Sequence, residues 1–271
     1  MDSTINDDRK AWMSALEGME SGKFDVEQLR EENSTPAVFT VPLGEYEGQL
    51  RNVIIDQSSF AHGAIVGCSG IGKSTALETL LCGLGVKYSP EVVEFVFASG
   101  KGPSSKASVL PHTRADFNVS VESDTADFVE YVRDLVSERQ SFAEEHELML
   151  VTPSDLPAVF IVAEEVSSVQ SPDFIDALET VATCGRALGI HLVLVGQRFS
   201  SKVFPADVVD NVGWVVAFRG FDGGFNVSDP VGNLDEEKPG QGFVLTKSTA
   251  QAVKVFLLDA GEDAFLQSVT S

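Results

Sequence analysis

The chain has 271 residues, of which 43 % are hydrophobic and 22 % charged. This composition is typical of a globular protein and excludes disordered, collagen-like and coiled-coil chains. The 41 acidic and 19 basic residues give a formal net charge of −22, which disfavours sequence-independent binding to DNA or anionic lipid, because phosphate contacts need basic side chains. No stretch approaches 18 consecutive apolar residues, so we expect no transmembrane helix.

Residues 1–35 indicate an acidic helical arm that precedes a domain of residues 36–271. Apolar residues recur at helical spacing between residues 7 and 33, namely Trp12, Leu16, Met19, Val26 and Leu29. Two interpretations remain open. The arm packs on its own domain, or it is a linker that docks on a neighbour.

Beyond the arm, stretches typical of strands alternate with helical stretches. We expect strands at 37–41, 50–55, 62–66, 92–98, 158–163, 191–195, 214–218, 242–247 and 251–257, with the first two forming a hairpin. Helices are expected at 73–84, 125–147 and 173–188. This alternation predicts an α/β fold with a mainly parallel central sheet flanked by helices on both faces.

The segment GCSGIGKS at residues 67–74 matches the phosphate-binding pattern G-x-x-x-x-G-K-[ST]. It follows an apolar strand and precedes a helix, the context in which backbone N–H groups surround phosphate. Lys73 would reach the β- and γ-phosphates of ATP, and the Ser74 hydroxyl would bind Mg²⁺. The expected nucleotide-binding residues are Gly67, Cys68, Ser69, Gly70, Ile71, Gly72, Lys73, Ser74 and Thr75.

Two carboxylates, Glu164 and Glu165, follow the apolar strand at 158–163. Parallel strands place ligands at their carboxyl ends, so Glu164 is expected to hold Mg²⁺ and Glu165 to polarise the attacking water. Two solvated glutamates at a strand end are the alternative. Gln197, after the strand at 191–195, would sense the γ-phosphate or orient water, or would be a structural amide.

Several stretches resemble the FtsK/SpoIIIE family, most closely the first ATPase module of the type VII secretion proteins EccC and EssC. They are VPLG (41–44), HGAIVGCSGIGKSTALETLL (62–81), YSPEVVEFVFASGKG (88–102), LPHT (110–113), LPAVFIVAEEVSSV (156–169), PDFIDALETVATCGRALGIHLVLVGQR (172–198) and PGQGFV (239–244). The resemblance implies a RecA-like core that uses ATP and Mg²⁺. It places Lys73 and Ser74 at the Walker A pair, Glu164 at the Walker B aspartate, Glu165 at the catalytic glutamate and Gln197 at the sensor glutamine.

The chain departs from this family pattern in three places. Glu164 replaces the usual, shorter aspartate. The family's Asp-Phe-Lys-Gly is Ser-Gly-Lys-Gly at residues 99–102, which removes a carboxylate, and no arginine follows Arg219. We therefore expect nucleotide binding to be intact and hydrolysis to be slow.

The expected function is that of a motor module in type VII protein secretion, which couples ATP binding and slow hydrolysis to assembly and export. The resemblance implies as partners ATP and ADP, neighbouring ATPase modules or a hexameric ring of copies, and a secreted protein or linker helix. It also implies a location at the cytoplasmic face of a membrane-bound complex. The three cysteines agree with this location, because they follow no metal-ligand spacing and their odd number is typical of a reducing compartment. A DNA translocase and a docking module without turnover are the alternatives.

Three basic residues have open roles. Lys101 and Lys106 are solvated charges or belong to a pore loop. Arg186 has an intersubunit role or acts as a sensor.

Overall fold

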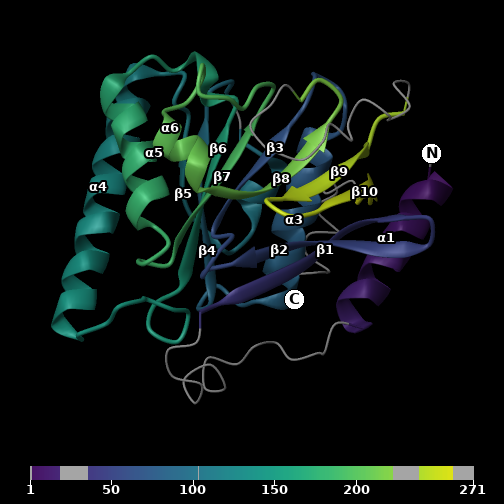
Figure 1. Cartoon of the computed structure of the whole chain (residues 1–271), viewed down its shortest axis with the longest axis horizontal. Coiled ribbons are helices and arrows are strands. Elements are labelled where there is room, and N and C mark those ends of the chain that lie inside the picture. Colours follow the sequence, from purple (N-terminus) through teal and green to yellow (C-terminus); the bar gives the residue numbers. More distant parts are fainter. Residues whose placement is uncertain (1, 19–35, 103, 222–237, 259–271) are drawn as a thin grey trace.

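The computed structural model describes residues 2–18, 36–102, 104–221 and 238–258, which form one large sheet with helices on both faces (Figure 1). The helices are α1 (Asp2–Gly18), α3 (Lys73–Lys87), α4 (Glu122–Glu145), α5 (Pro172–Cys184) and α6 (Ala206–Asn211), with 3₁₀ turns at Lys106–Val109 and Val166–Ser168. The expected α/β fold is confirmed. In the described part of the chain, no helix is long and apolar enough to cross a membrane.

The sheet has ten strands in the order β2-β1-β10-β9-β8-β3-β7-β6-β4-β5. Their bounds are β1 Val38–Tyr46, β2 Gln49–Asp56, β3 His62–Val66, β4 Val93–Ser99, β5 Thr113–Phe117, β6 Ala158–Glu164, β7 Ile190–Gly196, β8 Val212–Phe218, β9 Gln241–Thr246 and β10 Ala250–Val255. The six strands from β8 to β5 are parallel, and the other four join them by antiparallel pairing. The sheet is therefore mainly parallel, as expected.

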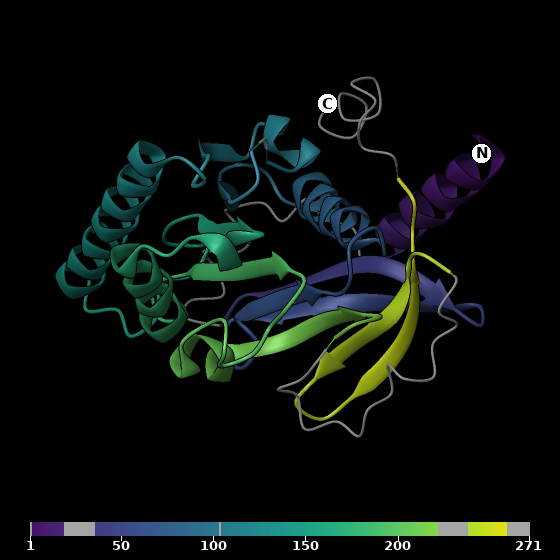
Figure 2. The ribbon, with the colours of Figure 1, turned by 90° about the horizontal axis from the view of Figure 1, so that it is seen from above.

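The central strands are apolar throughout because both of their faces are covered. In β7, Val193 and Val195 pack into one core with α1 and α3, while Leu192 and Leu194 pack into the other with α4, α5 and α6. Successive side chains of a strand point to opposite faces, so a continuous apolar run fills both cores. Figure 2 shows α1 and α3 on one side of the sheet and α5 and α6 on the other.

Some boundaries differ from those expected. The hairpin turn is confined to Glu47 and Gly48, which both have positive φ, because β1 continues through the turn-rich residues before it. The helix expected at 173–188 ends at Cys184, and a turn through Gly189, with φ of 65°, leads into β7. Phe142 near the end of α4 is half-buried and stacks on His146.

The first part of the arm packs on its own domain. Helix α1 buries Trp12 and Leu16 in the core that also contains α3. The first interpretation of the arm is thus confirmed for residues 2–18, while Met19, Val26 and Leu29 lie outside the described residues. The domain boundary at residue 35 stays a prediction.

Candidate nucleotide-binding site

The expected site residues meet at one edge of the sheet because β3, β7 and β6 are adjacent and parallel. The glycine loop leaves β3, Glu164 ends β6 and Gln197 follows β7. Carboxyl ends of parallel strands meet at a single edge, where α/β proteins bind their ligands. Topology therefore brings together residues more than a hundred positions apart.

The conformation of the glycine loop is fixed by positive φ angles and by backbone hydrogen bonds to neighbouring segments. Gly70 and Gly72 have φ values of 75° and 117°, which L side chains rarely adopt. The Cys68 N–H donates to the Arg219 carbonyl at 2.8 Å, and the Gly240 N–H donates to the Ile71 carbonyl at 2.8 Å. The loop is thus fixed on both sides before the first turn of α3, where a helix N-terminus favours anions.

Lys73, the first residue of α3, lies inside this loop. Its side chain is 8 % exposed, and Nζ donates to the carbonyls of Gly67 at 2.9 Å and Cys68 at 3.0 Å. Burial lowers the pKa of Lys73, and the nearby charge of Glu165 opposes that shift. Both carbonyls belong to the glycine loop itself.

Glu165 lies between two lysines. Its Oε1 is 3.8 Å from Lys73 Nζ, and its Oε2 is 3.1 Å from Lys101 Nζ. The exposed side chain of Lys101 ion-pairs with the candidate catalytic glutamate, and a place in a pore loop stays a prediction. That lysine follows Gly100, where a Cβ would lie 2.5 Å from the Glu165 carbonyl oxygen, so only glycine permits this approach of the loop.

Glu165 has an unusual backbone as well. Its φ of 50° and ψ of 33° lie in the left-handed region, which is uncommon for a residue with a side chain. The N–H of Glu165 donates to the Val195 carbonyl at 2.6 Å. Such conformations cost free energy and persist where the surrounding structure imposes them. The strand end thus turns sharply, and the two consecutive glutamates have different surroundings.

Glu164 faces the loop after β4 and is partly buried. One carboxylate oxygen accepts a hydrogen bond from the Ser105 N–H at 2.9 Å. Burial raises the pKa of Glu164 to about 7, with smaller contributions from the carboxylates of Glu78, Glu165 and Asp116, and the Ser105 bond opposes the shift. Near neutral pH, Glu164 is therefore divided between its neutral and ionised forms. The two glutamates are not the pair of simply solvated carboxylates that was the alternative.

The other expected residues take separate positions. Ser74 and Thr75 line a cavity of about 410 Å³ together with Gly70, Gly72 and Lys73. Gln197 and Cys68 are exposed near the site. Arg186 precedes β7, at the opposite edge of the sheet, where Nη1 donates to the Ser58 carbonyl at 2.8 Å. That position excludes a sensor role for Arg186 within its own site, while an intersubunit role stays a prediction.

One wall of this cavity was not expected from the sequence. It is formed by Thr4 and Asp8 of α1 and by Lys254, Val255 and Leu257 at the end of β10. No local pattern near residue 8 signals a ligand. Only the packing of α1 against the domain reveals this contribution.

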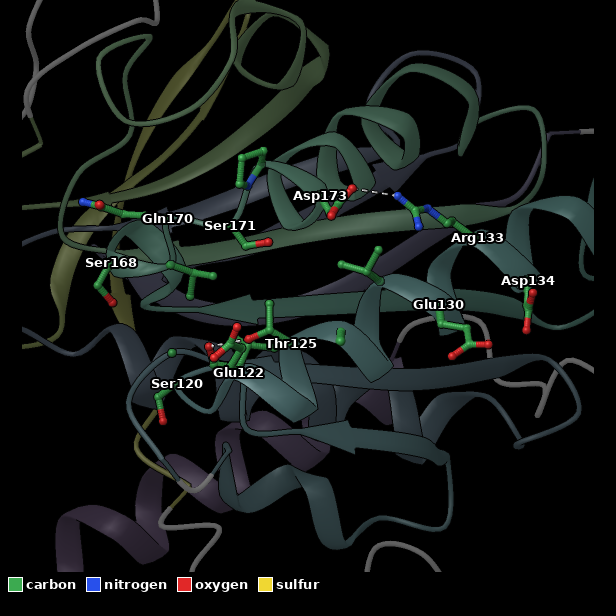
Figure 3. A pocket seen from close by; sticks show the side chains of 16 residues that line it. Ser120, Glu122, Thr125, Glu130, Arg133, Asp134, Ser168, Gln170, Ser171 and Asp173 are labelled. Atoms are coloured by element: carbon green, nitrogen blue, oxygen red, sulfur yellow. Dashed lines mark hydrogen bonds and ion pairs between the residues drawn. The ribbon is translucent and has the colours of Figure 1, made fainter.

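A second cavity, of about 910 Å³, lies between α4 and α5 and includes no residue of the glycine loop (Figure 3). Its lining is largely polar, and Arg133 pairs with Asp173 at 3.0 Å between the two helices. Gly100, which precedes Lys101, lies at this cavity and links it to the loop that reaches Glu165.

With this geometry in view, residues 26–149 match the family model described as the FtsK/SpoIIIE family. Over these residues the chain is similar to FtsK/SpoIIIE-family proteins. "Type VII secretion system protein EssC" of Staphylococcus aureus is 26 % identical over 217 residues, which is 72 % of this chain and 14 % of that protein. "ESX-4 secretion system protein EccC4" of Mycobacterium tuberculosis is 30 % identical over 163 residues, which is 53 % of this chain and 13 % of that protein.

Solved structures agree on the fold. The cytoplasmic domain of the Thermomonospora curvata type VII secretion ATPase EccC has a TM-score of 0.67 at 22 % identity, and covers 85 % of this chain and 31 % of its own. ATPases 2 and 3 of Geobacillus thermodenitrificans EssC have a TM-score of 0.65 at 18 % identity. The match covers 86 % of this chain and 47 % of that chain. The expected resemblance to an EccC or EssC module is confirmed, and this chain spans about one seventh of the curated relatives' length.

Two of the three departures from the FtsK/SpoIIIE pattern lie beside each other. Ser99, at the position of the missing carboxylate, is paired with Glu164 across β4 and β6. Ser99 is also buried. A carboxylate there would add a like charge next to Glu164, which is already hard to ionise. The serine and the longer glutamate are thus neighbouring changes in one part of the site.

Proposed function

We propose that this chain is a nucleotide-binding motor module of a type VII secretion system, which couples ATP binding and slow hydrolysis to assembly and protein export. The observation that carries the proposal is the approach of Glu165 to Lys73, at 3.8 Å, within a glycine loop at the sheet edge. A carboxylate beside a phosphate-binding lysine is an arrangement that can serve phosphoryl transfer to water. The secretion context is supported by the relatives named EssC and EccC4.

Each site residue has a defined task in this proposal. Backbone N–H groups of residues 67–75 bind the phosphates, and Lys73 exchanges its carbonyl partners for phosphate oxygens. Ser74 and Glu164 are oxygen donors of the kind that Mg²⁺ prefers, and the ion would neutralise phosphate charge. A carboxylate oxygen of Glu165 accepts the proton of the attacking water, and Gln197 orients that water.

Slow turnover follows from the partial protonation of Glu164. Glu164 must be ionised to hold Mg²⁺ well, and its pKa near 7 leaves it partly protonated at neutral pH. Glu165 is paired with the cations of Lys73 and Lys101, which fix the position of its carboxylate. If the hydrolysis rate fell to zero, the chain would be a docking module that binds nucleotide without turnover.

The wider assignments belong to the same proposal. Residues 36–271 would form the ATPase domain, and residues 1–35 an arm attached to it. The module would work beside other ATPase modules or in a hexameric ring, with ATP and ADP as ligands and a secreted protein or a linker helix as partner. It would act at the cytoplasmic face of a membrane complex.

Titration and turnover measurements on the whole chain test the nucleotide chemistry. Lys73→Ala should weaken MgATP binding by 100-fold or more, because it removes a charge-assisted contact from a low-dielectric site. Lys247→Ala removes an exposed lysine between β9 and β10 and is the charge-matched control. Glu165→Gln should retain binding and abolish hydrolysis. Wild-type affinity in Lys73→Ala would overturn the nucleotide assignment.

A DNA-binding measurement separates secretion from DNA translocation. The net charge of −22 predicts negligible affinity for duplex DNA at about 150 mM salt. Fluorescence anisotropy with duplexes of increasing length measures this affinity. Length-dependent, sub-micromolar binding would favour a translocase over a secretion module.

A further inference from the structure

The lining of the cavity beside the glycine loop comes from separate parts of the chain. Its loop end is formed by Gly70 and Gly72 and by the first turn of α3, where backbone N–H groups bind phosphate. The remaining lining includes Val255, Leu257 and residues of helix α1. With the phosphates at the glycine loop, the ribose and base of a nucleotide would lie against this remaining lining.

Helix α1 is held at this cavity by contacts to a segment far along the chain. The Leu257 N–H donates to Asp8 Oδ2 at 3.0 Å, and Arg9 Nε donates to the Leu258 carbonyl at 2.6 Å. Trp12, one turn further on, is fully buried. These contacts fix the orientation of the helix, so the side chains of Thr4 and Asp8, one helical turn apart, line the cavity together.

The Asp8 carboxylate can accept a further hydrogen bond. A carboxylate has about four acceptor positions, and the one bond to Leu257 leaves several of them. In the same cavity, Val255, Leu257 and Pro239 supply apolar surface beside Lys254. A flat, largely apolar ring that carries a hydrogen-bond donor fits this combination.

We propose that α1 forms the nucleobase end of the site and that Asp8 accepts a hydrogen bond from the exocyclic amino group of adenine. The inference rests on the proposed binding of nucleotide at the glycine loop. It assigns base selection to the N-terminal arm. Hypoxanthine carries a carbonyl oxygen where adenine carries its amino group, so Asp8 would face an acceptor and repel that base.

Comparison of ATP with ITP isolates this contact, because the two nucleotides have the same phosphates and ribose. Calorimetric titration of the whole chain should give about tenfold tighter binding of MgATP than of MgITP, the size typical of one charge-assisted hydrogen bond. Asp8→Asn should cut the preference to threefold or less, because its amide keeps an acceptor for Leu257 and can donate to the hypoxanthine carbonyl. Asp7→Asn, at an exposed carboxylate on the same helix, should keep the wild-type preference.

The outcomes separate this inference from the proposed function. Equal wild-type affinity for ATP and ITP overturns the role of Asp8 and leaves nucleotide binding in place. An unchanged preference in a folded Asp8→Asn variant, shown by an unaltered melting temperature, also overturns it. Binding of neither nucleotide by the wild-type chain overturns both proposals. Lys73→Ala should weaken both nucleotides equally, because it acts on the phosphates that they share.

Discussion

The two halves of the sheet build the candidate site in different ways. In the parallel half, β3, β6 and β7 each deliver polar residues immediately after an apolar strand. In the antiparallel half, β1 pairs with β10, and α1 is bonded to residues 249 positions away along the chain. The phosphate end of the site is therefore made of local strand-to-loop units, whereas the α1 end exists only once the two ends of the chain meet.

The largest effect is expected where α1 enters the core. Trp12 is fully buried beside the residues of α3, so Trp12→Ala should lower the free energy of unfolding by about 3–5 kcal/mol. Phe160→Ala, at an equally buried position of the parallel half, should cost a similar amount. Urea unfolding of both variants and of wild type gives the free energies of unfolding to be compared. If Trp12→Ala alone lowered the free energy of unfolding by less than about 1 kcal/mol, α1 would not contribute to the stability of the core.

A smaller, pH-dependent effect is expected at Glu164 in the parallel half. Its pKa is raised from 4.5 to about 7 by burial, so between these values the folded chain binds more protons than the unfolded chain. Stability from this group is present below pH 4.5 and is lost as pH rises through 7. Relative to wild type, Glu164→Gln should gain on the order of 1–2 kcal/mol in unfolding free energy between pH 5 and 8, measured without nucleotide.

If the stability difference between Glu164→Gln and wild type were independent of pH, the carboxyl group would not be buried as described. Glu147→Gln is the control, because this glutamate is exposed in the turn after α4. Its difference from wild type should stay constant over the same range.

The smallest change in stability is expected at Lys101. Its ion pair with Glu165 is exposed on the lysine side, and such pairs contribute about 0–1 kcal/mol. Lys101→Met should therefore leave the unfolding free energy within about 1 kcal/mol of wild type, yet lower ATP turnover roughly threefold to tenfold, because Glu165 loses a contact that orients it. Lys202→Met, at an exposed lysine, is the control. Unchanged turnover in Lys101→Met would remove Lys101 from the site.

The strands and helices that the sequence predicts well are those with strong apolar patterns. The strand expected at 62–66 coincides with β3, and those at 158–163 and 191–195 differ from β6 and β7 by a residue or two. Strand β5 was missed because it lies at the sheet edge and alternates half-buried with exposed residues, few of them apolar. Helix α6, with six residues, is too short to show a period.

For the site, the sequence alone determined the phosphate end. A glycine loop between strand and helix, and carboxylates after a parallel strand, are local features whose meaning does not depend on distant residues. Only the tertiary structure decided that Lys101 contacts Glu165, that burial shifts the pKa of Glu164, and that Asp8 lines the cavity beside the glycine loop. These properties arise from contacts between segments far apart in the chain, and no short stretch of sequence encodes which distant groups will surround a side chain.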